Sequence, residues 1–270
     1  MSTATLSPTL FGFFVATGRT KERPHTGNST KFTARLAGIF YLLVGILGGF
    51  AVGFVEPKMY AARDAAHTTQ TILANEGLVR MGVAADLLNQ AFFVALAVTL
   101  YALLKDVHRG AARAMVTFVG VAAAIASLNA VFLFEGLQVA TDPTYVDALG
   151  LKGMQAILLA LLDIQHYGLL AAQVFFGLWL APLGYLAFKS GRFPRALGVI
   201  LMVAAGCYLV DLLTAFLGPD LNDIIHAWVV IPCAVAEIWM VLYLLIVGTK
   251  SPISLVSATS DGETDEDNCG

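Results

Sequence analysis

Six long apolar runs dominate this sequence and leave few folds open to it. They cover roughly residues 36–55, 82–104, 114–134, 167–188, 196–217 and 227–247. Each run is close to the ~20 residues that a helix needs to cross about 30 Å of hydrocarbon. Polar and apolar residues alternate little within the runs, which argues against a transmembrane β-barrel. The sequence therefore predicts an all-α, polytopic membrane protein with a bundle of six transmembrane helices.

The composition supports this prediction. Hydrophobic residues make up 58% of the chain and charged residues 13%, whereas a soluble domain typically carries about 25% charged residues. Most of the folded surface must therefore face an apolar solvent, and we expect a multi-pass protein of the cell membrane that contacts lipids. Glycine-rich phosphate loops, basic patches with aromatic residues and haem-attachment motifs are absent from the sequence, which excludes nucleic acids as partners.

Most of the positive charge lies on one side of the apolar runs. The N-terminal segment, the second and fourth loops and the C-terminal tail carry 12 of the 16 Lys and Arg residues, and the remaining loops carry 4. Cytoplasmic loops of membrane proteins are enriched in Lys and Arg. We therefore expect both termini in the cytoplasm and the first, third and fifth loops on the outer side.

Two polar segments flank the apolar region. Residues 1–34 are polar and basic and rich in Ser and Thr, and residues 249–270 are acidic and contain no aromatic residue. Segments with so little hydrophobicity cannot bury enough apolar surface to fold. We predict a disordered N-terminal arm at 1–34, a transmembrane domain at 35–248 and a disordered acidic tail at 249–270.

The connection between the fourth and fifth runs has the residues of a tight turn. Gly191 can adopt the left-handed conformation that ends a helix, and Pro194 suits the first turn of the next helix. This predicts a helical hairpin with Lys189, Arg192 and Arg195 as topology anchors at the cytoplasmic interface. A binding site for anionic lipid headgroups is the alternative.

Several stretches resemble a known family. They are KFTARLAGIFYLLVGILGGF (31–50), LAVTLYALLKDVHR (96–109), FFGLWLAPLGYLAFKSGRFPRALGVILMVAAGCYLVD (175–211) and AEIWMVLYLLIVG (236–248). The most specific is the third, with its Gly-Tyr-Leu, Lys-Ser-Gly and Pro-Arg groups and its closing Tyr-x-x-Asp. These stretches resemble DUF4386, a family of uncharacterised multi-span bacterial membrane proteins. The resemblance implies a multi-span membrane protein and supplies no catalytic residue.

Polar side chains in the apolar runs gather toward one side of the predicted membrane. A charged group in a bilayer is costly unless it is paired or hydrated, so each one is a functional-site hypothesis. If the helices bring them together, they form an outward-facing polar pocket about half a membrane deep. The candidate pocket residues are Asp86, Asn89, Gln90, Glu135, Asp163, His166, Asp211, His226 and Glu237.

Part of this set also fits simpler roles. Asp163, His166 and His226, together with Glu56, can be interfacial residues hydrated at the headgroups. Asp86, Asn89 and Gln90 share one helical face and can form interhelical hydrogen bonds worth about 1 kcal/mol each. Asp211 and Glu237 lie deeper in their runs, which favours a function for these two acids.

The segment before the fourth run leaves two structures open. Residues 151–159 are amphipathic and fit a helix on the outer surface. They also fit the start of one long helix from about 152 to 189, which would bring Asp163 and His166 into the bundle. The choice decides whether these two residues belong to the pocket.

A glycine pattern in the first run suggests close helix packing. Gly45, Gly49 and Gly53 form two overlapping GxxxG steps, which let two backbones approach closely. Packing within the bundle is the favoured interpretation, and a homodimer face is the second. Cys207, Cys233 and Cys269 have no metal-type or disulfide-type spacing.

The pattern as a whole favours a non-enzymatic function. We expect a small transporter, an ion or proton pathway or a ligand-binding module, with no cofactor and with an unidentified small-molecule or ion ligand. The alternative is a membrane-embedded, metal-dependent lipid hydrolase. In that case His166 and His226, with nearby acids, would hold a divalent metal, although no HExxH motif or paired histidines support it.

Overall fold

The computed structural model describes residues 27–249, and every regular element in this range is a helix. The first transmembrane helix consists of three consecutive parts, α1, the π-helical η2 and α2. The last one consists of α8 and the π-helical η3. The bounds are α1 Gly27–Gly48, η2 Gly49–Val55, α2 Glu56–Met59, α3 Ala65–Ala74, α4 Glu76–Leu104, α5 Arg109–Thr141, α6 Pro143–Ser190, α7 Arg195–Leu217, α8 Pro219–Leu242 and η3 Tyr243–Val247.

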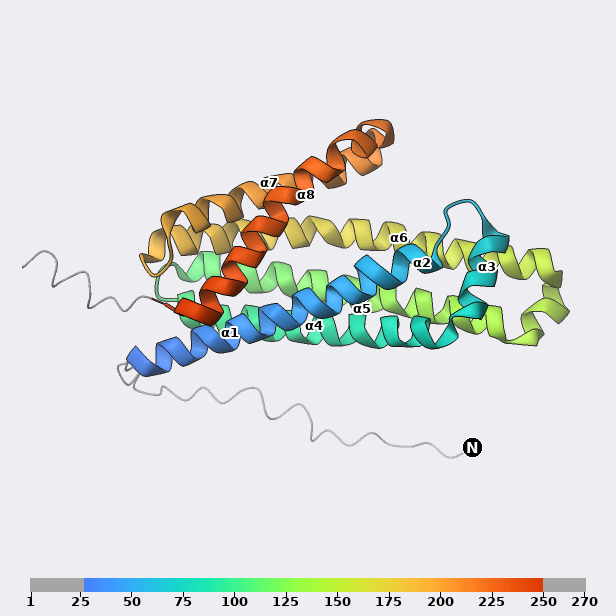
Figure 1. Ribbon diagram of the computed structural model, residues 1–270, viewed down its shortest axis with the longest axis horizontal. Coiled ribbons are helices and arrows are strands. Elements are labelled where there is room, and N and C mark those ends of the chain that lie inside the picture. Colours follow the sequence, from blue (N-terminus) through green and yellow to red (C-terminus); the bar gives the residue numbers. More distant parts are fainter. Residues whose placement is uncertain (1–26, 250–270) are drawn as a thin grey trace, which may run out of the picture.

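Six of these helices are long and apolar enough to cross a membrane. They are Ser29–Met59, Glu76–Leu104, Arg109–Thr141, Pro143–Ser190, Arg195–Leu217 and Ile224–Val247, and each contains one predicted run. The predicted fold class is confirmed, and the chain is a multi-pass α-helical membrane protein. The N-terminal end of α1 and the C-terminal end of α8 lie at the same end of the bundle (Figure 1).

The boundaries of the flanking segments are only partly visible. α1 begins at Gly27, so the last residues of the range 1–34, predicted as a disordered arm, are helical. The rest of that arm, and the acidic tail from residue 250 onward, lie outside the described residues.

The helices pack mainly with their neighbours in sequence. α4, α5, α6 and α7 lie side by side, α1 lies on α4, and α8 packs along α7. α8 then leans across the bundle, so that its C-terminal part and η3 reach α1 (Figure 1). α1 and α8 therefore meet at one end of the bundle and diverge toward the other.

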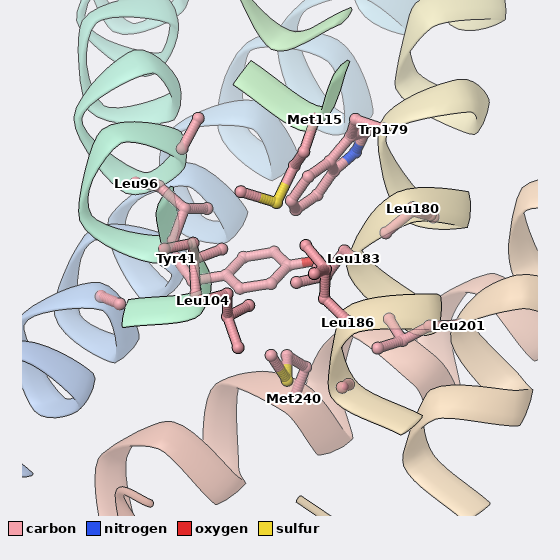
Figure 2. Close-up of a cluster of buried hydrophobic side chains, with 14 of the residues drawn as sticks. Tyr41, Leu96, Leu104, Met115, Trp179, Leu180, Leu183, Leu186, Leu201 and Met240 are labelled. Carbon is pink, nitrogen blue, oxygen red and sulfur yellow. The ribbon is translucent and has the colours of Figure 1, made fainter. Parts of the chain in front are cut away.

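A large apolar core fills the end of the bundle where α1 and α8 meet. Figure 2 shows Leu96 and Leu104 of α4, Leu183 and Leu186 of α6, and Met240 of α8 among its members. All five side chains are fully buried. Inside a bilayer such contacts stabilise the bundle through close packing rather than through exclusion of water.

Two glycines bring α6 and α7 into backbone contact. A Cβ atom at Gly184 would lie 2.7 Å from the carbonyl oxygen of Gly198, which is closer than real Cβ contacts. The connection between these helices is the predicted hairpin, because Gly191 ends α6 in the left-handed conformation, with φ 64°. The hairpin is fixed to its surroundings, since Tyr243 donates a hydrogen bond to the Arg192 carbonyl and the Arg192 side chain donates to the Leu103 carbonyl.

α6 is the longest helix and settles the two alternatives for residues 151–165. It runs from Pro143 to Ser190, with one break at Gly150, where φ is 69° and ψ is 165°. Residues 151–165 therefore continue into the fourth span and do not form a separate surface helix. At about 1.5 Å per residue, the part after Gly150 alone exceeds the ~30 Å of a hydrocarbon core.

The projecting ends of α5 and α6 have a core of their own. Leu137 of α5 and Leu158 and Leu162 of α6 are fully buried, with Met59 of α2 and Ile72 of α3 packed in the same cluster. The short α3, which has no counterpart among the predicted helices, covers this cluster (Figure 1). The bundle is thus extended at the end opposite to the start of α1.

Candidate functional site

A cavity of about 880 Å³ lies between α1–η2, α4, α6, α7 and α8. It occupies the region where α1 and α8 diverge. Its exposed lining residues include Gly45 and Gly49 on α1–η2 and His226 and Val230 on α8. The cavity therefore opens sideways, between the first and the last span.

Most of the polar residues singled out in the sequence lie along this cavity. Their helices converge although the residues are far apart in the chain. Glu135 and Asp163 are the two candidates that do not line it. The candidates that do are Asp86, Asn89, Gln90, His166, Asp211, His226 and Glu237.

Glu237 lines the cavity at the side of the apolar core. The hydroxyl of Tyr208 donates to Oε1 of Glu237 at 2.7 Å, and the hydroxyl of Tyr41 donates to Oε2 at 3.3 Å. Each carboxyl oxygen thus has a donor, one from α7 and one from α1. These hydrogen bonds join the first, fifth and sixth spans across the floor of the cavity.

Asp211 is the centre of a hydrogen-bond network nearer the opposite end. Its Oδ1 atom accepts from Nδ2 of Asn222 at 3.0 Å and lies 2.7 Å from Nδ1 of His226. Its Oδ2 atom accepts from Nε2 of Gln173 at 2.9 Å. The Asp211 side chain is buried, while the His226 side chain is 57% exposed. Asp211 therefore fixes the start of α8 against α6 and α7.

Asp86, Asn89 and Gln90 form the polar part of the α4 wall. Nε2 of Gln90 donates to Oδ1 of Asp86 at 2.8 Å. Asn89 and Gln90 are 7% and 4% exposed, respectively. Among the described residues, their side-chain oxygens, Oδ1 of Asn89 and Oε1 of Gln90, are buried and accept no hydrogen bond. Buried polar atoms without a hydrogen-bond partner are unusual and cost free energy. This wall therefore differs from Asp211 and Glu237, whose carboxyl oxygens all have hydrogen-bond partners.

His166 lies at the edge of the cavity, in a small polar cluster with α2. Its Nδ1 atom is 3.3 Å from Oε1 of Glu56, and its ring stacks on Tyr60 with 5.2 Å between centroids. Tyr60 in turn donates a hydrogen bond to Asp163. This contact explains why the Asp163 side chain lies outside the cavity. Partial burial, followed by the hydrogen bond to Asp163, raises the pKa of Tyr60 well above its ordinary value, so Tyr60 remains a donor.

Glu135 belongs to the projecting end of the bundle rather than to the cavity. It accepts a hydrogen bond of 3.3 Å from the hydroxyl of Tyr145, which joins α5 to the first part of α6. The arrangement indicates a structural contact between two neighbouring helices.

The structure adds four residues, absent from the candidates, that donate hydrogen bonds to Asp211 or Glu237. Tyr41, Gln173, Tyr208 and Asn222 all line the cavity. Helical spacing could have found three of them. Tyr208 lies three residues before Asp211, Asn222 four before His226, and Gln173 seven after His166, so each shares a helical face with a predicted residue.

Aromatic rings form the other wall of the cavity. Phe93 stacks on Phe176 with 5.5 Å between centroids and meets Trp179 edge-on at 5.1 Å. Tyr41 lies beside the same Trp179 ring at 5.7 Å. Beyond Trp179 the next turn of α6 brings Leu183 into the apolar core (Figure 2). The packed core therefore closes the cavity toward the end of the bundle where α1 begins and η3 ends.

The glycines of the first span do not pack within the bundle, so the favoured interpretation of the GxxxG pattern is wrong. A Cβ atom at Gly45, Gly49 or Gly53 would meet nothing within 4 Å among the described residues. Gly45 and Gly49 instead line the mouth of the cavity. A homodimer through this face stays a prediction.

The arrangement of the polar side chains gives little support for a metal site. Within residues 27–249 there is no group of three or more His, Cys, Asp and Glu side chains that could hold a metal ion. His166 pairs with Glu56 and His226 with Asp211, each as a two-residue contact. The metal-dependent hydrolase is therefore not favoured.

Comparison with known proteins identifies the family. No curated protein and no solved structure gives a significant match to the chain. A match is found to the family described as Domain of unknown function (DUF4386), over residues 36–248. This range includes every residue that lines the cavity. The resemblance predicted from the sequence is confirmed, and the chain belongs to the DUF4386 family.

Proposed function

We propose that the cavity binds a lipophilic organic cation. The observation that carries this proposal is the charge of its lining. Asp86, Asp211 and Glu237 face the cavity, and its described lining residues include no Lys or Arg. Carboxyl groups in an apolar surrounding attract positive charge far more strongly than they do in water.

The aromatic wall suits the same ligand. Phe93, Phe176 and Trp179 present ring surfaces next to the polar wall of α4. Cations bind favourably over aromatic faces within about 6 Å of the ring centroid, and most favourably over Trp. The cavity volume of about 880 Å³ falls within the ~300–1,000 Å³ that is usual for small-molecule sites. The site thus combines negative charge with apolar surface.

The position of the opening explains why the ligand is lipophilic. The mouth lies between the spans Ser29–Met59 and Ile224–Val247, at Gly45, Gly49 and Val230. A lateral opening within the hydrocarbon region admits molecules that partition into the bilayer. The packed core beside Trp179 favours a binding site over a continuous ion pathway.

We further propose that the polar end of the cavity faces outward across the cell membrane. The side with most Lys and Arg is the end where the described chain begins and ends, and such sides are usually cytoplasmic. Asn222 and His226 lie near the start of α8, at the opposite end. This orientation suits a small transporter or a ligand-binding module that captures cations from the outer leaflet.

The test is equilibrium binding of radiolabelled tetraphenylphosphonium to the full-length protein in detergent. We expect saturable binding that is weakened roughly tenfold or more by Asp86→Asn or Glu237→Gln, since each replaces an acidic group of the cavity by a neutral amide. Glu135→Gln is the matched control, because Glu135 is an acid in a span but does not line the cavity. Equal binding by the wild type and the cavity variants would contradict the proposal.

A further inference from the structure

The three acids of the cavity differ in how many hydrogen bonds they already accept. Asp211 accepts from Gln173 and Asn222 and contacts His226. Glu237 accepts from two tyrosine hydroxyls, one on each oxygen. Asp86 has one such partner, the amide of Gln90, on Oδ1. Asp86 is therefore the cavity acid with the most capacity left for a ligand.

The neighbours of Asp86 add two further acceptors. Oδ1 of Asn89 and Oε1 of Gln90 are buried without a partner among the described residues. The Gln90 amide is oriented by its bond to Asp86, which leaves its oxygen as the free end. All three side chains come from neighbouring turns of α4 and line the cavity. The α4 wall thus offers acceptors without matching donors.

We infer that the α4 wall binds the N–H groups of a primary ammonium, so that the ligand is a lipophilic primary amine rather than a quaternary cation. A primary ammonium carries a positive charge and three donors, which match Asp86 and the oxygens of Asn89 and Gln90. A quaternary nitrogen has no donor and would leave both amide oxygens unsatisfied. This inference rests on the proposed function and adds the chemical class of the ligand.

The apolar part of this ligand has a place on the same helix. Phe93 follows Asn89 by four residues and Gln90 by three, so it lies one turn farther along the same face of α4. Its ring lies against Phe176 and Trp179 in the cavity wall. An amine bound at Asp86 would therefore extend its hydrophobic group over this aromatic cluster, away from the Asp211 network.

The experiment compares phenylbutylamine with its trimethylammonium derivative, which differ only at the nitrogen. Isothermal titration of each compound into the full-length protein in detergent gives two independent affinities. For the wild type we expect the primary amine to bind roughly tenfold more tightly. Its charged N–H groups would satisfy buried acceptors of the protein, which should change the affinity by about tenfold or more. Equal affinities, or tighter binding of the quaternary compound, would overturn the inference.

Variants then assign the preference to the two amides. Asn89→Leu and Gln90→Met are close in shape and remove the orphaned oxygens. Gln90→Met also removes the hydrogen bond from Nε2 of Gln90 to Asp86, so Asn89→Leu is the cleaner of the two variants, because it removes an unsatisfied buried oxygen without breaking a hydrogen bond that holds Asp86. We expect each variant to lose most of the preference for the primary amine while keeping the affinity for the quaternary compound. Gln165→Met is the control, since Gln165 is a buried glutamine, 7% exposed, that does not line this cavity. A preference that survives in both Asn89→Leu and Gln90→Met would refute the role of the α4 wall.

The two proposals fail in different ways. If tetraphenylphosphonium binds through the cavity acids but the two amines bind equally, the inference fails and the proposed function stands. If only the primary amine binds, and Asn89→Leu and Gln90→Met abolish that binding, the cavity is a cation site restricted to primary ammonium ligands and both proposals stand. If none of the three compounds binds, both are overturned.

Discussion

Nδ1 of His226 lies 2.7 Å from Oδ1 of Asp211, and this contact joins the start of the last span to the span before it. Asp211 is buried, and its other contacts come from Gln173 on α6 and Asn222 on α8. One carboxyl group thus fixes three helices at the end of the cavity where α8 leans away from α1. We expect the width of the mouth to depend on this network.

Replacement of Asp211 by Asn should loosen that end of the bundle. An amide has one acceptor oxygen where the carboxylate has two, and its NH₂ group faces donors. Hydrogen bonds between spans are worth about 0.6–1.7 kcal/mol each, so we expect a loss of ~1–2 kcal/mol, seen as a lower Tm in detergent. Asp220→Asn, at an exposed acid of the same helix as His226, is the control. A Tm for Asp211→Asn equal to that of Asp220→Asn would show that the network does not fix the helices.

The contact between α6 and α7 predicts a sharp difference between two glycines of α7. A Cβ atom at Gly198 would lie 2.7 Å from the Phe188 backbone nitrogen, whereas at Gly206 it would meet nothing within 4 Å. Gly198→Ala should destabilise the protein by about 1–3 kcal/mol through overpacking. Gly206→Ala should be neutral or stabilising by up to ~1 kcal/mol, because alanine favours helix. Thermal unfolding of both variants checks this, and similar Tm values would argue against backbone contact here.

Variants of two glycines in the first span test access to the cavity and self-association separately. Gly49 lines the cavity and Gly53 does not, although both are exposed on the same span. Gly49→Leu should weaken tetraphenylphosphonium binding roughly tenfold by filling the mouth, and Gly53→Leu should leave it unchanged. Light scattering of the same samples tests the predicted homodimer, which Gly53→Leu would convert to a monomer. Unchanged binding by Gly49→Leu would place the entrance elsewhere.

The proposed orientation is tested by labelling intact cells. Gln70 on α3 and Asp106 between α4 and α5 are both exposed, at opposite ends of α4. In a background with Cys207, Cys233 and Cys269 replaced by Ala, a membrane-impermeant maleimide should label Gln70→Cys and leave Asp106→Cys unlabelled until the cells are lysed. The reverse pattern would place the termini outside and turn the cavity toward the cytoplasm.

Much of the fold could be predicted from the sequence because the determining signals are local. Long apolar runs with few charges admit only transmembrane helices, and all six were found. Gly191 marked the hairpin, since a positive φ there follows from glycine chemistry. The start of α1 at Gly27 and the short α3 were missed, because both contain many polar residues and lie outside the apolar runs.

The candidate site could be predicted only in part. Asp86, Asn89 and Gln90 share a helical face by spacing, so their common position in the cavity wall was open to prediction. The convergence of particular helices depends on packing between segments that are distant in the chain. The sequence of a single apolar run does not encode this packing. Tyr41 and Tyr208 were therefore missed as partners of Glu237, and Asp163 was grouped with the pocket although Tyr60 holds it outside.

The most direct test of a cation-binding cavity uses two probes of nearly the same size and shape but opposite charge. Equilibrium dialysis of the purified protein against tetraphenylphosphonium and against tetraphenylborate measures the effect of charge alone. The account predicts saturable binding of the phosphonium, reduced by Asp86→Asn and Glu237→Gln, and no saturable binding of the borate, because carboxyl groups line the cavity without Lys or Arg among its described residues. Equal binding of the two ions, or a preference for the borate, would contradict it.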